Sequence, residues 1–196
     1  MKITGQVHKP NITVGERRSF ALDSIVLCEI NIDADCTFND LERFDSFVFI
    51  SKNGVIHKNT DLVFYNNLSD DKKIVTESLV ESPTYDIQLR FKVSELNSID
   101  EKIEVYLRFD FFKPTKTIFD YFKKTVSKKL NIQFILLDKK MIQFEKGETN
   151  LMPCNTLKLF ELSKLNDETF QVQFTSETSD ITIEEIIENK LKKADG

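Results

Sequence analysis

The chain has 196 residues, of which 40% are hydrophobic and 30% are charged, and its 17 Phe give it ample bulk for a core. A chain of this size can fold without disulfides or a metal, which excludes a small stapled scaffold. With five Gly and four Pro it is neither collagen-like nor proline-rich, and its formal net charge of −5 has the wrong sign for a globally basic nucleic-acid-binding protein.

Alternation of apolar and polar residues predicts β-strands along most of the chain. The first clear strand is expected at 26–33. Residues 44–50 are apolar on both faces, which predicts a central strand covered on each side. Asn53 and Gly54 then supply the tight turn of a hairpin whose second strand is expected at 61–65.

Two longer alternating segments and four shorter ones follow. The longer strands are expected at 85–93 and 103–111, and the shorter ones at 131–138, 141–145, 156–162 and 169–174. About nine strands at this spacing are typical of an all-β, antiparallel two-sheet β-sandwich. No internal repeat or composition shift marks a boundary, so the sequence predicts a single domain over residues 1–178 and an appended segment over residues 179–196.

Two segments change to helical spacing. Residues 118–129 predict a short internal amphipathic helix. Thr182, with Glu185 three residues later, has the form of a capping box and predicts a C-terminal helix of about three turns. We expect the apolar stripe of this helix to pack on the sandwich or on another copy of the chain, because an isolated short helix is marginal in water. The stripe consists of Ile183, Ile186, Ile187 and Leu191.

The three cysteines indicate whether the chain folds in an oxidising or a reducing compartment of the cell. Cys28, Cys36 and Cys154 form no CxxC pair, so they indicate neither a disulfide framework nor a thiolate zinc site. Cys28 lies on the apolar side of its strand and is expected to be a small buried hydrophobe. No signal-peptide-like start or membrane-spanning apolar run is visible. We therefore expect a cytoplasmic protein with no transmembrane segment and, from these features, no cofactor.

One string of residues resembles a known family. The string consists of Asn53-Gly54, a short link, and then Asp61-Leu62-Val63-Phe64-Tyr65-Asn66-Asn67-Leu68, and it is similar to the hairpin of the TerD family of tellurium-resistance and stress-response proteins. The similarity extends over roughly residues 12–174. It implies an antiparallel β-sandwich that in typical members binds calcium through acidic loops.

The calcium-binding loops of that family are poorly matched. The resemblance leaves as candidate ligands Glu42, Asp45, Asn66, Asn67 and Asp86. Phe44 stands where the family carries an acid, and residues 76–86 lack the family's glycines and most of its carboxylates. Calcium takes about six to eight oxygen ligands, so the resemblance implies that calcium binding is degraded or lost. For the two asparagines we favour the alternative that they hydrogen-bond loop backbone.

No enzyme is expected. His8 and His57 have no partner at metal or triad spacing, and Asp70 and Asp71 are interpreted as solvated loop charge. The first hypothesis is therefore a non-enzymatic TerD-like stress-response or interaction module that binds a protein partner or associates with itself.

A different class of function stays open. Residues 113–129 contain six lysines and one acid, Asp120, in an otherwise acidic chain. A basic amphipathic helix of this kind can dock on an anionic surface, lipid or nucleic acid, although a solvated helix face is the simpler interpretation. The lysines are Lys113, Lys116, Lys123, Lys124, Lys128 and Lys129.

Overall fold

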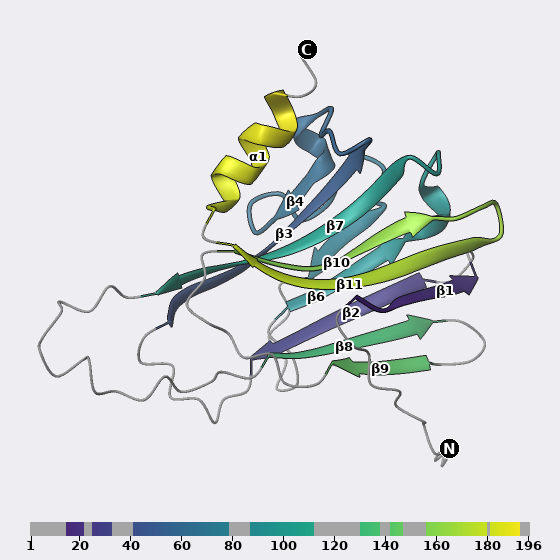
Figure 1. The fold of residues 1–196 in the computed structure, drawn as a ribbon, viewed down its shortest axis with the longest axis horizontal. Helices are drawn as coiled ribbons and strands as arrows, with labels where there is room; N and C mark the ends of the chain where they lie inside the picture. The colour runs from purple at the N-terminus through teal and green to yellow at the C-terminus, as the bar shows by residue number, and fades with distance from the viewer. Residues whose placement is uncertain are drawn as a thin grey trace, which may run out of the picture.

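The computed structural model describes eight stretches of the chain, namely 15–21, 25–32, 41–78, 87–111, 130–137, 142–146, 156–179 and 181–192. Over these residues the chain forms eleven β-strands, two single 3-10 turns and one α-helix. The strands make two antiparallel sheets that share one core, which confirms the predicted two-sheet sandwich (Figure 1).

The larger sheet has six strands in the order β1-β11-β10-β7-β3-β4. Its strands are β1 (Arg17–Ala21), β3 (Leu41–Lys52), β4 (Leu62–Phe64), β7 (Glu101–Phe111), β10 (Thr156–Lys164) and β11 (Thr169–Ser179). The long strands β3 and β7 are neighbours inside this sheet, with Phe49 opposite Glu104. The Asn53-Gly54 turn after β3 has φ angles of 53° and 77°, the left-handed geometry that a tight hairpin requires.

The smaller sheet has five strands in the order β5-β6-β2-β8-β9. Its strands are β2 (Ile25–Ile32), β5 (Val75–Ser78), β6 (Ile87–Lys92), β8 (Leu130–Leu137) and β9 (Ile142–Lys146). All nine predicted strands are present. The sequence analysis missed β1 and β5, which have only five and four residues and too few apolar positions to show alternation.

The core between the sheets is built from the alternating apolar residues. Cys28, Leu89 and Phe91 of the smaller sheet face Val105 and Phe160 of the larger one, and all five are fully buried. The rings of Phe91 and Phe160 meet edge to face with centroids 6.0 Å apart. Cys28 is a small buried hydrophobe, as predicted, and burial raises the pKa of its thiol well above the ordinary value.

The C-terminal helix α1 (Ile183–Lys192) covers the outer face of the larger sheet, and in Figure 1 it lies against β3 and β4. The predicted capping box is present, because the backbone N–H of Thr182 donates to Oε2 of Glu185 at 2.9 Å and that of Glu185 donates to Oγ1 of Thr182 at 3.3 Å. Ile183 is buried in a second apolar cluster with Phe47 and Phe49.

This second cluster explains the apolar residues on both faces of β3. Val48 and Ile50 point into the core between the sheets, whereas Phe47 and Phe49 point outward and are covered by α1. The prediction of a central strand covered on each side is therefore confirmed.

Some expectations fall outside the described residues and stay predictions. These are the internal helix over 118–129 and the surroundings of Cys36 and Cys154. In the part of the chain that the structure describes, no helix is long and apolar enough to cross a membrane.

Candidate functional site

The structure describes the side chains of three of the five predicted calcium ligands, Asp45, Asn66 and Asn67. Nδ2 of Asn67 donates a hydrogen bond to the carbonyl oxygen of Leu62 at 2.6 Å. The Asn67 side chain therefore bonds backbone, which is the alternative to metal binding that we favour for the two asparagines. Asn66 is exposed in the same turn and Asp45 is half-buried in β3. Glu42 belongs to β3, but the structure describes only its backbone, and Asp86 lies outside the described residues.

A buried carboxylate that the sequence analysis missed lies beside Asp45. Glu77 of β5 is 5% exposed and neighbours Asp45 and Ser46 of β3, on the other sheet. Burial, followed by the negative charge of Asp45, raises the pKa of Glu77 to about 7, although the nearby Ser46 hydroxyl works in the opposite direction. The inward position of Glu77 follows from that of Val75, two residues earlier in β5, but a strand of four residues gives no sequence signal for it.

These residues do not fit calcium. Asp45, Ser46 and Glu77 offer two carboxylates and one hydroxyl, whereas calcium takes about six to eight oxygens. Among the residues that the structure describes, no three acidic, histidine or cysteine side chains come together as a metal-binding group. The family's metal chemistry therefore has no complete ligand shell in the described stretches.

A second buried carboxylate, Glu104 of β7, lies under α1. Its Oε2 accepts from Nζ of Lys190 at 2.6 Å and from Oγ of Ser51 at 3.0 Å, and its Oε1 lies 3.1 Å from Nζ of Lys158. The Tyr106 hydroxyl completes the set, donating to Oε1 at 3.3 Å. Burial alone would raise the pKa of Glu104, but the charges and hydrogen bonds of Lys190 and Lys158 outweigh burial and lower it to about 2.

The ion pairs continue across the sheet and along the helix. Lys158 and Lys102 both hold Glu161, at 3.1 and 3.0 Å. Arg108 of β7 contacts Glu184 of α1 at 2.6 Å. Every one of these groups is thus used to hold the helix or the neighbouring strands, which is a structural role.

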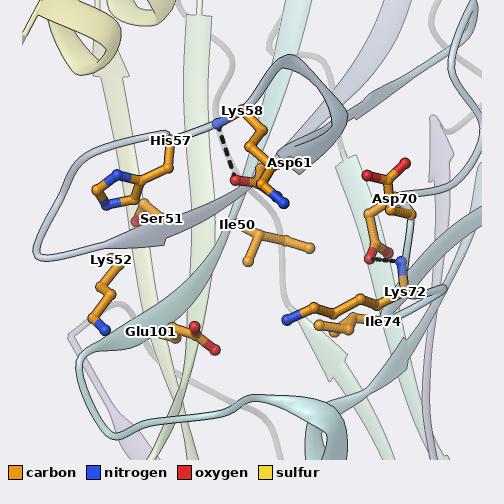
Figure 2. Close-up of a pocket in the computed structure, with 11 residues that line it drawn as sticks. Ile50, Ser51, Lys52, His57, Lys58, Asp61, Asp70, Lys72, Ile74 and Glu101 are labelled. Atoms are coloured by element: carbon orange, nitrogen blue, oxygen red, sulfur yellow. Dashed lines mark hydrogen bonds between the residues drawn. The ribbon is translucent and has the colours of Figure 1, made fainter. Parts of the chain in front are cut away.

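A pocket lies where β3 runs into the hairpin turn and β7 begins (Figure 2). Its volume is about 180 Å³. Three loops wall it: the β3 turn, the short 3-10 turn η1 (Asn59–Asp61), and the turn that precedes β5. It is lined by Ile50, Ser51, Lys52, His57, Lys58, Asp61, Asp70, Asp71, Lys72, Ile74 and Glu101.

The structure corrects one expectation at this pocket. Asp70 was expected to be solvated, yet it is only 5% exposed. Its Oδ1 accepts from the backbone N–H of Val75 at 2.7 Å and its Oδ2 from that of Lys72 at 2.9 Å. An Asp side chain can accept hydrogen bonds from its own turn whether the turn is buried or exposed, and the local sequence does not show which applies here.

The remaining predicted sites have simple outcomes. The apolar stripe of α1 lies on its own chain, with Ile183 buried and Ile186, Ile187 and Leu191 packed against the outer cluster. The six lysines of residues 113–129 lie outside the described residues, so docking to an anionic surface stays a prediction.

Two solved structures are similar to this one. The crystal structure of SAV2460, a protein of unknown function, aligns with a TM-score of 0.57 and 8% sequence identity over 84% of this chain and 94% of that chain. SCO6318 from Streptomyces coelicolor A3(2), a homologue of the telluride resistance protein TerD, aligns with a TM-score of 0.55 and 10% identity over 82% of this chain and 92% of that chain.

No family model and no curated protein matches the chain. At identities this low, the structural likeness concerns the fold alone. The resemblance of the hairpin string is borne out at that level: the chain has a TerD-like β-sandwich fold.

Proposed function

We propose that the chain is a non-enzymatic, TerD-like interaction module of the cytoplasm that binds a protein partner or a second copy of itself and has lost tight calcium binding. The observation that carries this proposal is the combination of a TerD-like sandwich with candidate calcium ligands put to other uses. Asn67 holds its own turn, and Asp45 has an uncharged or weakly charged neighbour in Glu77, whose pKa is about 7.

The buried charges support a binding role over a catalytic one. Catalysis by acid or base needs a titratable group that can reach a substrate. Glu104 and Lys158 are the most strongly engaged charges in the described residues, and both are enclosed by partners from the sheet and α1. Their bonds hold structural elements together.

The apolar stripe of α1 is not available as an interface for self-association, because it packs against its own chain. The stripe already covers Phe47 and Phe49, so a second copy would have to displace the helix or use another surface. We therefore place the interaction surface elsewhere, with α1 as a fixed part of the module.

The test is complementation in the organism that encodes the chain. A deletion strain challenged with tellurite should regain growth when the chain is returned, and Asp45→Asn should restore growth equally well. Rescue that is lost with Asp45→Asn, in a variant that retains the melting temperature, would show that the carboxylate works in the module. No phenotype under tellurite or oxidative stress would contradict the stress-response role. Sedimentation velocity of the purified chain separates self-association from a different partner.

A further inference from the structure

The geometry of the pocket in Figure 2 points to a ligand that neither the fold nor the comparisons assign. We propose that this pocket binds a small oxyanion of the phosphate class between the ammonium groups of Lys58 and Lys72. The two lysines enter from different loops, and Figure 2 shows their ends directed into the pocket on either side of Ile50. This inference goes beyond the proposed module and does not depend on it.

Three of the carboxylates that line the pocket already accept hydrogen bonds from backbone N–H groups of the chain. Both oxygens of Asp70 accept backbone N–H groups, and Oδ2 of Asp61 accepts from the N–H of Lys58 at 3.1 Å. Oε2 of Glu101 accepts from the N–H of Asn97 at 2.7 Å. Three of the four carboxylates therefore brace the loops of the pocket through hydrogen bonds to backbone N–H groups.

The lysines that line the pocket differ in their ion pairs from four other lysines that the structure describes. Lys102, Lys158, Lys164 and Lys190 all make ion pairs. In contrast, within the described residues the ammonium groups of Lys52, Lys58 and Lys72 form no close ion pair, although the charge of Lys58 interacts with the neighbouring carboxylate of Asp61. A ligand that supplies acceptor oxygens would satisfy them, and charge-assisted hydrogen bonds of this kind are strong.

The pocket holds these donors on a fixed frame. Asp70 fixes the turn that carries Lys72. Its side chain accepts the two backbone N–H groups described above, and its carbonyl oxygen accepts the N–H of Lys73 at 3.0 Å. Lys73 itself has a φ of 55°, which is left-handed geometry for a residue with a side chain. The floor consists of Ile50 and Ile74, both buried, and an apolar floor strengthens a hydrogen bond made above it.

Size and charge limit the ligand to a small one. A pocket of about 180 Å³ has room for a phosphate group but not for a polymer. Three lysines stand against four carboxylates, so the lining as a whole has no positive excess to attract any anion at long range, and binding has to come from close contact with the two ammonium groups. Asp71, exposed at the rim, is the acid with no hydrogen bond among the described residues, and its charge works against an anion.

The experiment is calorimetric titration of the full chain with inorganic phosphate at low salt, with glycerol phosphate and acetate as further probes. We expect saturable binding of phosphate. Lys58→Ala and Lys72→Ala should each weaken it about tenfold, because each removes a charge-assisted bond. Asp71→Asn should tighten it severalfold. Lys73→Ala is the matched control, since Lys73 is adjacent to Lys72 but does not line the pocket, and it should leave the affinity unchanged.

Several results decide the matter. Absence of heat and of chemical-shift changes with either phosphate probe overturns the proposal, as does an equal loss in Lys73→Ala and Lys72→Ala. Tighter binding of glycerol phosphate than of inorganic phosphate identifies a phosphomonoester, and the reverse order identifies free phosphate. Because Lys58 and Lys72 are exposed, we expect their substitution to leave the fold intact. The variants Lys58→Gln and Lys72→Gln repeat the test with a polar side chain that is longer than that of Ala but uncharged.

Discussion

The ammonium group of Lys190 in α1 lies 2.6 Å from Oε2 of Glu104 in β7, although the two residues are 86 positions apart. Their side chains are 16% and 7% exposed, so solvent and salt screen the pair only weakly. Because Glu104 is opposite Phe49, this ion pair lies beside the apolar contact that α1 makes with the sheet. The helix is therefore held by both charge and burial.

Replacing Lys190 by Met should lower the free energy of unfolding by about 2 kcal/mol. The substitution leaves Glu104 buried with one ammonium partner, Lys158, and a buried charge that loses a partner is costly. Urea denaturation measures the change. Asn189→Ala, at an exposed position of the same helix, is the control and should stay within about 0.5 kcal/mol. A similar effect in both variants would mean that the ion pair contributes nothing specific.

Phe49→Ala should cost about 3–5 kcal/mol, because Phe49 is fully buried between β3, Tyr106 and α1. Its ring lies 5.0 Å from that of Tyr106. Thermal and urea unfolding measure the loss. Ile181→Ala removes an apolar side chain that is 48% exposed, and it should change stability little. A loss below about 1 kcal/mol for Phe49→Ala would show that the helix does not seal this site.

Truncation after Ser179 should expose the outer cluster of Phe47, Phe49, Ile56 and Tyr106. A contiguous apolar patch of this kind promotes association, so we expect a lower melting temperature together with dimers or aggregates. Sedimentation and binding of a hydrophobic dye measure both effects. Thr182→Ala is a milder change than truncation, because it removes only the N-cap of α1, and it should lower the free energy of unfolding by about 1 kcal/mol. An unchanged mass and melting temperature after truncation would contradict the assigned role of α1.

The strands were predictable because their alternation spans five or more residues, as in Ile103 to Phe111. What alternation cannot show is the layer that covers each face. Glu104 is a polar residue on the supposedly solvated side of β7, yet it is 5% exposed because α1 lies over it. Phe49 is likewise buried on the outer face of its sheet, because α1 covers that face.

The pocket was less predictable than the fold. Lys58 and Asp61 belong to one loop and Lys72 to another, and only the folded hairpin and the turn before β5 bring the two loops together. His57 is exposed at this pocket. Loop residues of this kind have no periodicity, so their proximity depends on tertiary structure that local sequence does not encode.

Glu77 and Glu104 should give opposite pH dependences of stability. The pKa of Glu77 is raised in the folded chain from 4.5 to about 7, so its contribution is full below about pH 4.5 and is lost as the pH rises through 7. The pKa of Glu104 is lowered from 4.5 to about 2, so its contribution is full above about pH 4.5 and is lost as the pH falls toward 2.

The variant Glu77→Gln isolates the first of these effects. Oε2 of Glu77 is buried without a hydrogen-bond partner among the described residues, so ionising it is costly. We expect Glu77→Gln to be more stable than the parent at pH 8 by up to about 3 kcal/mol, and nearly equal at pH 5. Glu95→Gln, at an exposed carboxylate, should leave the pH profile unchanged. Parallel curves for the parent and Glu77→Gln would contradict the raised pKa.

Calcium should not raise the melting temperature. A site with a dissociation constant near 10 μM would add about 2.7 kcal/mol at roughly 1 mM calcium, which is a shift of several degrees for a chain of this size. The described residues offer Asp45, Ser46 and Glu77 at the expected end of the sandwich, and two carboxylates with one hydroxyl do not offset the cost of removing water from a divalent cation. Magnesium serves as the control for non-specific screening. A rise of several degrees with calcium that EDTA reverses and Asp45→Asn abolishes would contradict this prediction and would show that the chain binds calcium through Asp45 with an altered ligand set.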